Sequence, residues 1–229
     1  MIIFYTRLIF KKIANTFFII TRKSNFKTAI DEDFFINTIF INLNHRKDRL
    51  LETQKELNKF SKIKFKRNSA VKYDPGYIGC TLSHINSISI SIEKDFPYVL
   101  ICEDDIEFNI SEKHLYEIFE SFLKSESPIL CVGNTNSINK KFNNLLNRSY
   151  NIQTTSCYLV KKSFYPILLL SFSRALRFQF AGAKDYYCAI DQVWKDLQYK
   201  YIFTTPIESI LKQRPSYSDI VKKNVSYHK

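Results

Sequence analysis

Residues 97–105, Pro97-Tyr-Val-Leu-Ile-Cys-Glu-Asp-Asp105, decide the fold that we expect for this chain. The unbroken run of apolar and aromatic residues after Pro97 predicts a strand that is buried on both faces. Buried strands of this kind belong to parallel sheets, in which crossover helices join one strand to the next. Three adjacent carboxylates, Glu103, Asp104 and Asp105, follow the strand at its carboxyl end. In open α/β sheets, ligands bind at that end of the strands.

The segments on either side repeat this alternation of strand and helix. Further strands are predicted at residues 38–43, 63–67, 128–133, 156–160 and 201–205. Helices are predicted at residues 50–60, 83–95, 112–124, 162–178 and 186–197, and the Asn-rich residues 134–153 are predicted to be loop. The helix at 83–95 is ambiguous, because Ser and Ile alternate there as in a strand, but a crossover is needed before residue 98. The order predicts an α/β fold, with a mostly parallel sheet and helices on both of its faces.

The positive charge of the chain is concentrated at its two ends. The formal net charge is +12, of which residues 1–30 carry +6 and residues 212–229 carry +4. A near-neutral middle with basic ends favours solvated ends without a specific partner, or contact with an anionic membrane surface, over a nucleic-acid-binding protein, which remains the rival class. We expect a single domain at 31–229 and, at 1–30, a basic, partly apolar segment that lies on a membrane surface or packs on the domain.

The length of the apolar segments and the cysteines indicate where the protein acts. No apolar stretch reaches the roughly 18 residues of a membrane span, and residues 1–30 fit a signal peptide poorly. The five cysteines are odd in number, lie mostly among apolar neighbours and form no CxxC motif. They predict buried, reduced thiols rather than a disulfide framework or a zinc site. We therefore expect a cytoplasmic protein, with peripheral attachment to the inner face of the membrane as a possibility that residues 1–30 leave open.

The three adjacent carboxylates are the strongest candidate for a site. Like charges repel one another, and a divalent cation such as Mg²⁺ or Mn²⁺ removes that cost while binding substrate phosphates. In an extended chain, Glu103 and Asp105 point to one side and Asp104 to the other. The pattern predicts that Glu103 and Asp105, or Asp105 alone, face the metal. The alternative is an acidic turn at the surface.

Two basic or glycine-containing motifs are candidates for binding an anion. In Asn42-Leu-Asn-His-Arg-Lys-Asp-Arg49, the side chains of Arg46 and Arg49 have the spacing to hold a pyrophosphate, although basic turns are common. In Pro75-Gly-Tyr-Ile-Gly-Cys-Thr-Leu-Ser-His84, the glycines permit close backbone approach, and Ser83-His84 is predicted to open a helix beside the sheet. A lone histidine is more often structural than catalytic.

One further acid is a candidate for proton transfer. Asp191 lies in the apolar segment Ala189-Ile-Asp-Gln-Val-Trp194 and is a candidate general base. The alternative is an acid on a solvated helix face.

Read in order, these motifs resemble glycosyltransferase family 25, the lipooligosaccharide-biosynthesis type that also includes collagen galactosyltransferases. The matching segments are Ile41–Arg49, Gly76–His84, Leu100–Asp105, Thr155–Val160, Ile190–Gln192 and the tail Pro206…Gln213…Ser218-Asp-Ile220. Tyr77 stands where the family often has Glu, which puts acceptor choice in doubt, and Cys102 replaces a usual Leu. Residues 1–30 lie outside the resemblance.

The resemblance implies a GT-A type, Rossmann-like fold and transfer of a hexose, commonly galactose or glucose, from a UDP-sugar with inversion. The residues considered above supply candidates for that mechanism: Glu103 and Asp105 for a Mn²⁺ or Mg²⁺ ion, and Asp191 for the base. The residues expected to bind the nucleotide-sugar are Asn42, Leu43, Arg46, Arg49, Gly79, Ser83, His84 and Asp104.

The expected acceptor is a lipooligosaccharide or lipopolysaccharide glycan, and no nucleic acid is expected as a partner. One alternative acceptor is hydroxylysine of a collagen-like protein. Another reading is a degenerate family member without activity, against which the intact Glu103-Asp104-Asp105 argues.

Overall fold

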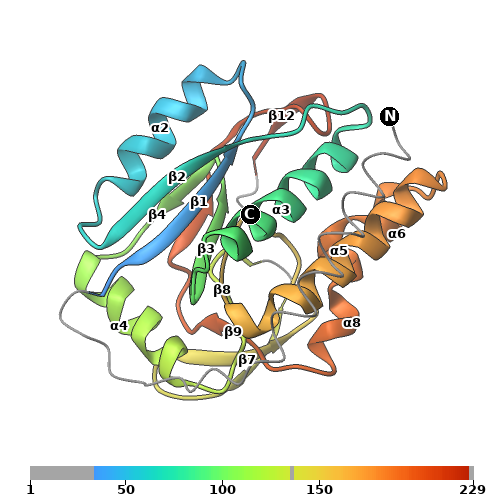
Figure 1. The fold of residues 1–229 in the computed structure, drawn as a ribbon. Helices are drawn as coiled ribbons and strands as arrows, with labels where there is room; N and C mark the ends of the chain where they lie inside the picture. The colour runs from blue at the N-terminus through green and yellow to red at the C-terminus, as the bar shows by residue number, and fades with distance from the viewer. Residues whose placement is uncertain (1–33, 135–136, 227–229) are drawn as a thin grey trace.

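An eight-stranded mixed sheet runs through the computed structural model, which describes residues 34–134 and 137–226 (Figure 1). In spatial order its strands are β2 (Ile63–Ser69), β1 (Ile36–Asn42), β3 (Tyr98–Glu103), β8 (Cys157–Lys161), β5 (Ile129–Cys131), β9 (Phe203–Pro206), β7 (Leu146–Tyr150) and β6 (Ile138–Lys141). Two small antiparallel pairs accompany it: β4 (Ile106–Phe108) with β10 (Leu211–Gln213), and β11 (Ser216–Ser218) with β12 (Lys223–Val225).

Most strands of the sheet point the same way. The strands β2, β1 and β3 are parallel neighbours, as are β5 and β9. Between these groups, β8 runs antiparallel to both β3 and β5. Beyond β9, strand β7 pairs antiparallel with both β9 and the edge strand β6. Six of the eight strands therefore share one direction, which confirms the mostly parallel α/β class. The antiparallel insertion of β8 was not expected from the sequence.

Helices cover both faces of the sheet, as predicted. The helices α3 (Gly76–Glu93) and α5 (Tyr165–Phe180) lie together on one face, and α2 (Lys47–Leu57) and α4 (Glu112–Lys124) lie on the other (Figure 1). Strand β3 shows how the layers form, because its successive side chains point to opposite faces. Val99 and Ile101 belong to the core under α3 and α5, whereas Leu100 and Cys102 belong to the core under α2 and α4.

Several predicted boundaries are wrong. Helix α3 begins at Gly76 rather than Ser83, because Pro75 precedes a helix that runs straight through Gly79. Residues 138–150 form the hairpin β6–β7 rather than a loop, since strands made mostly of polar side chains carry no apolar pattern. The helix expected at 186–197 is instead divided into α6 (Asp185–Cys188), α7 (Ile190–Val193) and α8 (Lys195–Gln198).

Other predictions about the elements are confirmed. Helix α4 matches its predicted limits, and the Ser111 hydroxyl caps it by accepting a hydrogen bond from the His114 amide. Pro166 lies in the first turn of α5, which follows the short 3-10 helix η1 (Lys162–Phe164). All five cysteines are free thiols, and four of them are buried.

The predicted basic segment at residues 1–30 lies outside the described residues. Among the residues that are described, none of the helices combines the length and the hydropathy required to cross a bilayer.

Candidate functional site

A cavity of about 540 Å³ opens where the parallel strands β1, β2 and β3 end. Its walls come from the segment after β1, the loop at residues 70–74 after β2, the first turns of α3, the carboxylates at 103–105 and the C-terminal residues 217–222. The residues that line it include Leu43, His45, Arg49, Lys72, Gly76, Gly79, Cys80, Ser83, His84, Glu103, Asp104, Asp105 and Asp219. The cavity therefore occupies the end of the sheet at which the sequence predicted a site.

Gly79 and Ser83 hold one wall of the cavity in place. A Cβ atom on Gly79 would collide with the carbonyl oxygen of Val71, so only glycine lets this loop lie directly on α3. The hydroxyl of Ser83 accepts a hydrogen bond from the Val71 amide at 2.8 Å and donates one to the Gly79 carbonyl at 2.7 Å. Gly79 and Ser83 thus hold the loop that follows β2 against α3.

Asp104 is held by the protein itself. Its two carboxylate oxygens accept hydrogen bonds of 2.7 Å each, one from the Arg49 guanidinium and one from the Asn42 amide. Thr53 donates to its backbone carbonyl at 2.8 Å. Burial raises the pKa of Asp104, and the charge of Arg49 opposes that effect. The carboxylate of Asp104 therefore acts as an anchor between β1, α2 and the end of β3.

Glu103 and Asp105 have weaker protein partners. Asp105 is only 5% exposed, and the donors nearest to its carboxylate are Gln213 at 3.3 Å and Arg49 at 3.5 Å. Burial, followed by the negative charge of Glu103, raises the pKa of Asp105 to about 7. Both residues line the same cavity. The negative charge of these two carboxylates is only partly balanced by donors of the protein. Their oxygens are the kind of ligand that Mg²⁺ and Mn²⁺ prefer. The residues present therefore fit such a cation.

Arg46 connects the segment after β1 to the C-terminal residues. Its guanidinium pairs with Asp48 and, at 2.9 Å, with Asp219, and it donates to the carbonyl of Tyr217 at 2.8 Å. The hydrogen bond from Arg46 is the main reason that the pKa of Asp48 falls to about 2. His45 also contacts Asp219, at 2.9 Å. Arg46 is thus committed to holding one rim of the cavity and does not line it.

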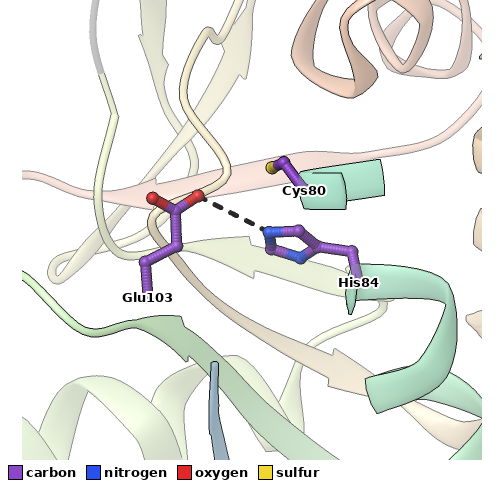
Figure 2. Close-up of side chains that lie close together, drawn as sticks. All are labelled: Cys80, His84 and Glu103. Atoms are coloured by element: carbon purple, nitrogen blue, oxygen red, sulfur yellow. Dashed lines mark ion pairs between the residues drawn. The ribbon is translucent and has the colours of Figure 1, made fainter. Parts of the chain in front are cut away.

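His84 lies beside Cys80 and Glu103 on the inner wall (Figure 2). Its imidazole is 1% exposed, its Nδ1 lies 3.0 Å from the hydroxyl of Tyr158, and its Nε2 lies 3.5 Å from a Glu103 carboxylate oxygen. The Nε2 atom has no hydrogen-bond partner among the described residues. Cys80 precedes His84 by one helical turn, so both side chains lie on one face of α3.

Asp191 lies close to this group but not on the cavity wall. One of its carboxylate oxygens accepts a hydrogen bond of 3.1 Å from the Thr154 amide. Burial raises the pKa of the Cys80 thiol well above its usual value, and the charges of Glu103, Asp191 and Asp105 raise it further. The negative charge of Asp191 therefore acts on the thiol of Cys80, which lines the cavity.

The structure brings most of the predicted site residues to one place. Those that line the cavity are Leu43, Arg49, Gly79, Ser83, His84, Glu103, Asp104 and Asp105. Asn42 lies behind Asp104, and Arg46 and Asp191 lie outside the lining. Sequence reasoning missed Lys72 and Cys80, and it saw residues 218–220 only through the resemblance of the tail. Loop residues such as Lys72 have no periodic signal that could have identified them.

Comparison with known proteins identifies the family. Residues 74–188 match the glycosyltransferase family 25 (LPS biosynthesis protein) family. The chain belongs to glycosyltransferase family 25. The matched segment includes the start of α3, the cluster at Cys80 and His84, and the carboxylates at 103–105. Membership confirms the resemblance seen in the sequence, and the observed sheet and its layers are those of an α/β fold.

Individual relatives are more distant. A Haemophilus influenzae protein provisionally named a glycosyltransferase is 38% identical over 71 residues, which are 31% of this chain and 24% of that protein. A glycosyltransferase involved in glycosylation of the major capsid of PBCV-1 has a TM-score of 0.42 at 10% identity, covering 76% of this chain and 92% of its own. The glycosyltransferase GlyE of Streptococcus pneumoniae has a TM-score of 0.43 at 9% identity, covering 75% and 45%. Structural similarity at this level carries no functional argument.

Proposed function

We propose that this family 25 member is an inverting hexosyltransferase that moves galactose or glucose from a UDP-sugar to a lipooligosaccharide or lipopolysaccharide acceptor. One observation supports it above the others. Glu103 and Asp105, at the carboxyl end of β3, face the cavity into which the amino end of α3 also opens at Gly76. Carboxylates beside a helix N-terminus suit a ligand that combines a divalent cation with phosphate groups.

The donor diphosphate would lie in the cavity, in front of the amino end of α3. The 18-residue helix α3 presents the positive end of its dipole there. Lys72 lines the same wall, is exposed, and forms no ion pair with any residue that the structure describes. Arg49 reaches the cavity from α2, although it also holds Asp104. These three sources of positive charge would orient the diphosphate and stabilise it as it departs.

Glu103 and Asp105 would hold the Mn²⁺ or Mg²⁺ ion. A bound divalent cation would neutralise charge on the departing diphosphate. Asp104 is unsuited to this role, because Arg49 and Asn42 already occupy both of its oxygens. We therefore propose that Glu103 and Asp105 are the metal ligands and that Asp104 positions them.

Asp191 is the proposed general base. In a single displacement, the acceptor hydroxyl oxygen forms a bond to the anomeric carbon while the bond from that carbon to the diphosphate oxygen breaks. The hydroxyl proton passes to the Asp191 carboxylate, and UDP leaves with the electron pair. The Thr154 amide donates a hydrogen bond to one Asp191 oxygen at 3.1 Å, and the other oxygen would take the proton. Attack on the face opposite to the diphosphate inverts the anomeric configuration.

The acceptor and the location are proposed on the family resemblance and on the basic residues 1–30. A lipid-linked glycan at the cytoplasmic face of an anionic membrane would place the acceptor near that segment. Among the residues that the structure describes, none of the helices is suited to crossing the bilayer.

The test is a screen of UDP-sugars for release of UDP by the purified chain, with Mn²⁺ and with EDTA. We expect metal-dependent release from one donor, and loss of that release in Asp105→Ala. Asp48→Asn is the matched control, because Asp48 pairs with Arg46 outside the cavity lining. If no donor releases UDP and calorimetry detects no UDP binding with Mn²⁺, the proposed activity is wrong. The chain would then be a family member without catalytic activity.

A further inference from the structure

We propose that Cys80, His84 and Glu103 form a binding site for a thiophilic divalent cation, and that Zn²⁺ is the ion whose preferences they match. One sulfur, one imidazole nitrogen and one carboxylate oxygen from these residues all lie within 4.8 Å of one another (Figure 2). The mixture of a soft sulfur, an imidazole and a carboxylate distinguishes this group from Glu103 and Asp105, which offer oxygen alone.

The local structure explains why the three residues meet. Cys80 and His84 are separated by four positions on α3, so their side chains project from the same face of the helix one turn apart. Glu103 ends β3, and its side chain points to the α3 face of the sheet (Figure 2). The cysteine pattern predicted no zinc site, because the spacing of Cys80 and His84 is that of a helix face rather than a CxxC motif.

His84 carries the main evidence that something binds here. Its imidazole is 99% buried, yet its Nε2 atom has no hydrogen-bond partner among the described residues and is directed towards Glu103. A buried polar atom without a hydrogen bond is costly unless a ligand satisfies it. The other nitrogen, Nδ1, lies 3.0 Å from the Tyr158 hydroxyl. When Nδ1 donates its proton to Tyr158, Nε2 presents a lone pair, which is the arrangement of a metal-ligating histidine with an outer hydrogen bond.

The size and charge of the cluster also suit a dication. Zn²⁺ binds sulfur at about 2.3 Å and nitrogen or oxygen at about 2.0–2.2 Å, so its ligand atoms lie roughly 3.5 Å apart. Side-chain movements of about an ångström would close the present spacing to that value. Asp105 and Asp191 add negative charge around the Cys80 sulfur, and both Cys80 and Glu103 line the cavity. The fourth coordination position would therefore face the cavity.

The proposed site shares Glu103 with the oxygen-only site of the proposed function. A zinc ion held by Cys80, His84 and Glu103 would withdraw Glu103 from Asp105, so Zn²⁺ should inhibit sugar transfer that depends on Mn²⁺. Binding of Zn²⁺ itself does not require the chain to be a transferase. A failure of zinc binding and a failure of transfer are therefore separate results.

The experiment uses the full chain without a histidine tag, in a non-thiol reductant, titrated with Co²⁺ as a spectroscopic substitute for Zn²⁺. We expect one Co²⁺ per chain, tetrahedral visible absorption and a thiolate-to-cobalt charge-transfer band, all removed by one equivalent of Zn²⁺. Cys80→Ser should abolish the charge-transfer band. Glu103→Gln, at a partly exposed position, should weaken Zn²⁺ binding by more than about tenfold in competition with a chromophoric chelator.

Two further variants keep the test decisive. Tyr158→Phe retains all three ligands and should weaken Zn²⁺ binding about tenfold through loss of the hydrogen bond to His84. His114→Ala is the matched control, because His114 pairs with Glu117 at the exposed surface of α4 and should leave Zn²⁺ binding unchanged. Circular dichroism would verify that each variant is folded. A wild-type titration without the charge-transfer band, or one that Cys80→Ser leaves intact, would overturn the proposal.

Discussion

Replacing Asp105 with Asn should stabilise the metal-free protein at the same time as it removes metal binding. Burial and the charge of Glu103 raise the pKa of Asp105 from 3.8 to about 7. Between those two values the folded protein retains a proton that the unfolded chain has lost, so stability falls as the pH rises through this window. Three pH units correspond to about 4 kcal/mol, which is an upper bound on what the charged carboxylate costs the folded state at pH 8.

Asparagine carries no charge to desolvate. At pH 8 in EDTA, Asp105→Asn should therefore raise the free energy of unfolding by about 2–4 kcal/mol, and at pH 4 by almost nothing. Differential scanning calorimetry would show this as a rise in Tm of roughly 5–10 °C at pH 8. Mn²⁺ should raise the Tm of the wild type and leave that of the variant unchanged.

Asp48→Asn is a control that should change the free energy of unfolding in the opposite direction. Its pKa is lowered to about 2 by the hydrogen bond from Arg46, so at pH 8 the charged carboxylate favours the folded state, and its removal should slightly lower the Tm. If Asp105→Asn destabilises the protein at pH 8 in EDTA, Asp105 is a structural acid and the argument from its charge is refuted.

Three other substitutions separate binding from structure. Lys72→Ala should raise the Kd for UDP about fivefold at low ionic strength without changing Tm, because Lys72 is exposed on the cavity wall; isothermal titration at two salt concentrations would show the effect shrinking with salt. Gly79→Ala should lower the free energy of unfolding by about 1–3 kcal/mol in urea denaturation, because its Cβ would collide with the Val71 carbonyl; an unchanged midpoint would contradict the close packing. Arg49→Met should lower the free energy of unfolding by about 3–5 kcal/mol in the same urea denaturation, because Asp104 loses its buried partner. A loss below about 1 kcal/mol would mean that the pair of Arg49 and Asp104 is not important to the fold.

The six strands β1, β2, β3, β5, β8 and β9 and the position of the site could be predicted, because these strands have local apolar patterns. The short strands β4, β10, β11 and β12 were not predicted. The run before Glu103 marked a buried strand, and the rule that ligands bind at strand ends placed the site there. The hairpin β6–β7 could not be predicted in this way, because its strands consist mostly of polar residues and resemble a loop.

The division of roles within the site depended on tertiary contacts. Arg46 and Arg49 have the same charge and similar spacing from β1, yet Arg46 pairs with Asp219 outside the cavity lining and Arg49 pairs with Asp104. Asp219 lies 173 residues from Arg46 in the sequence. Similarly, Glu103 approaches His84 only because β3 ends beneath α3. No local pattern contains such pairings.

Calorimetric titration of UDP into the purified chain, with Mn²⁺ and with EDTA, tests the central claim most directly. The account predicts one UDP bound per chain with Mn²⁺, binding at least about tenfold weaker in EDTA, and loss of the metal dependence in Asp105→Asn. Equal UDP binding with and without Mn²⁺, or full metal dependence in Asp105→Asn, would contradict the assignment of this cavity as a metal-dependent nucleotide-sugar site.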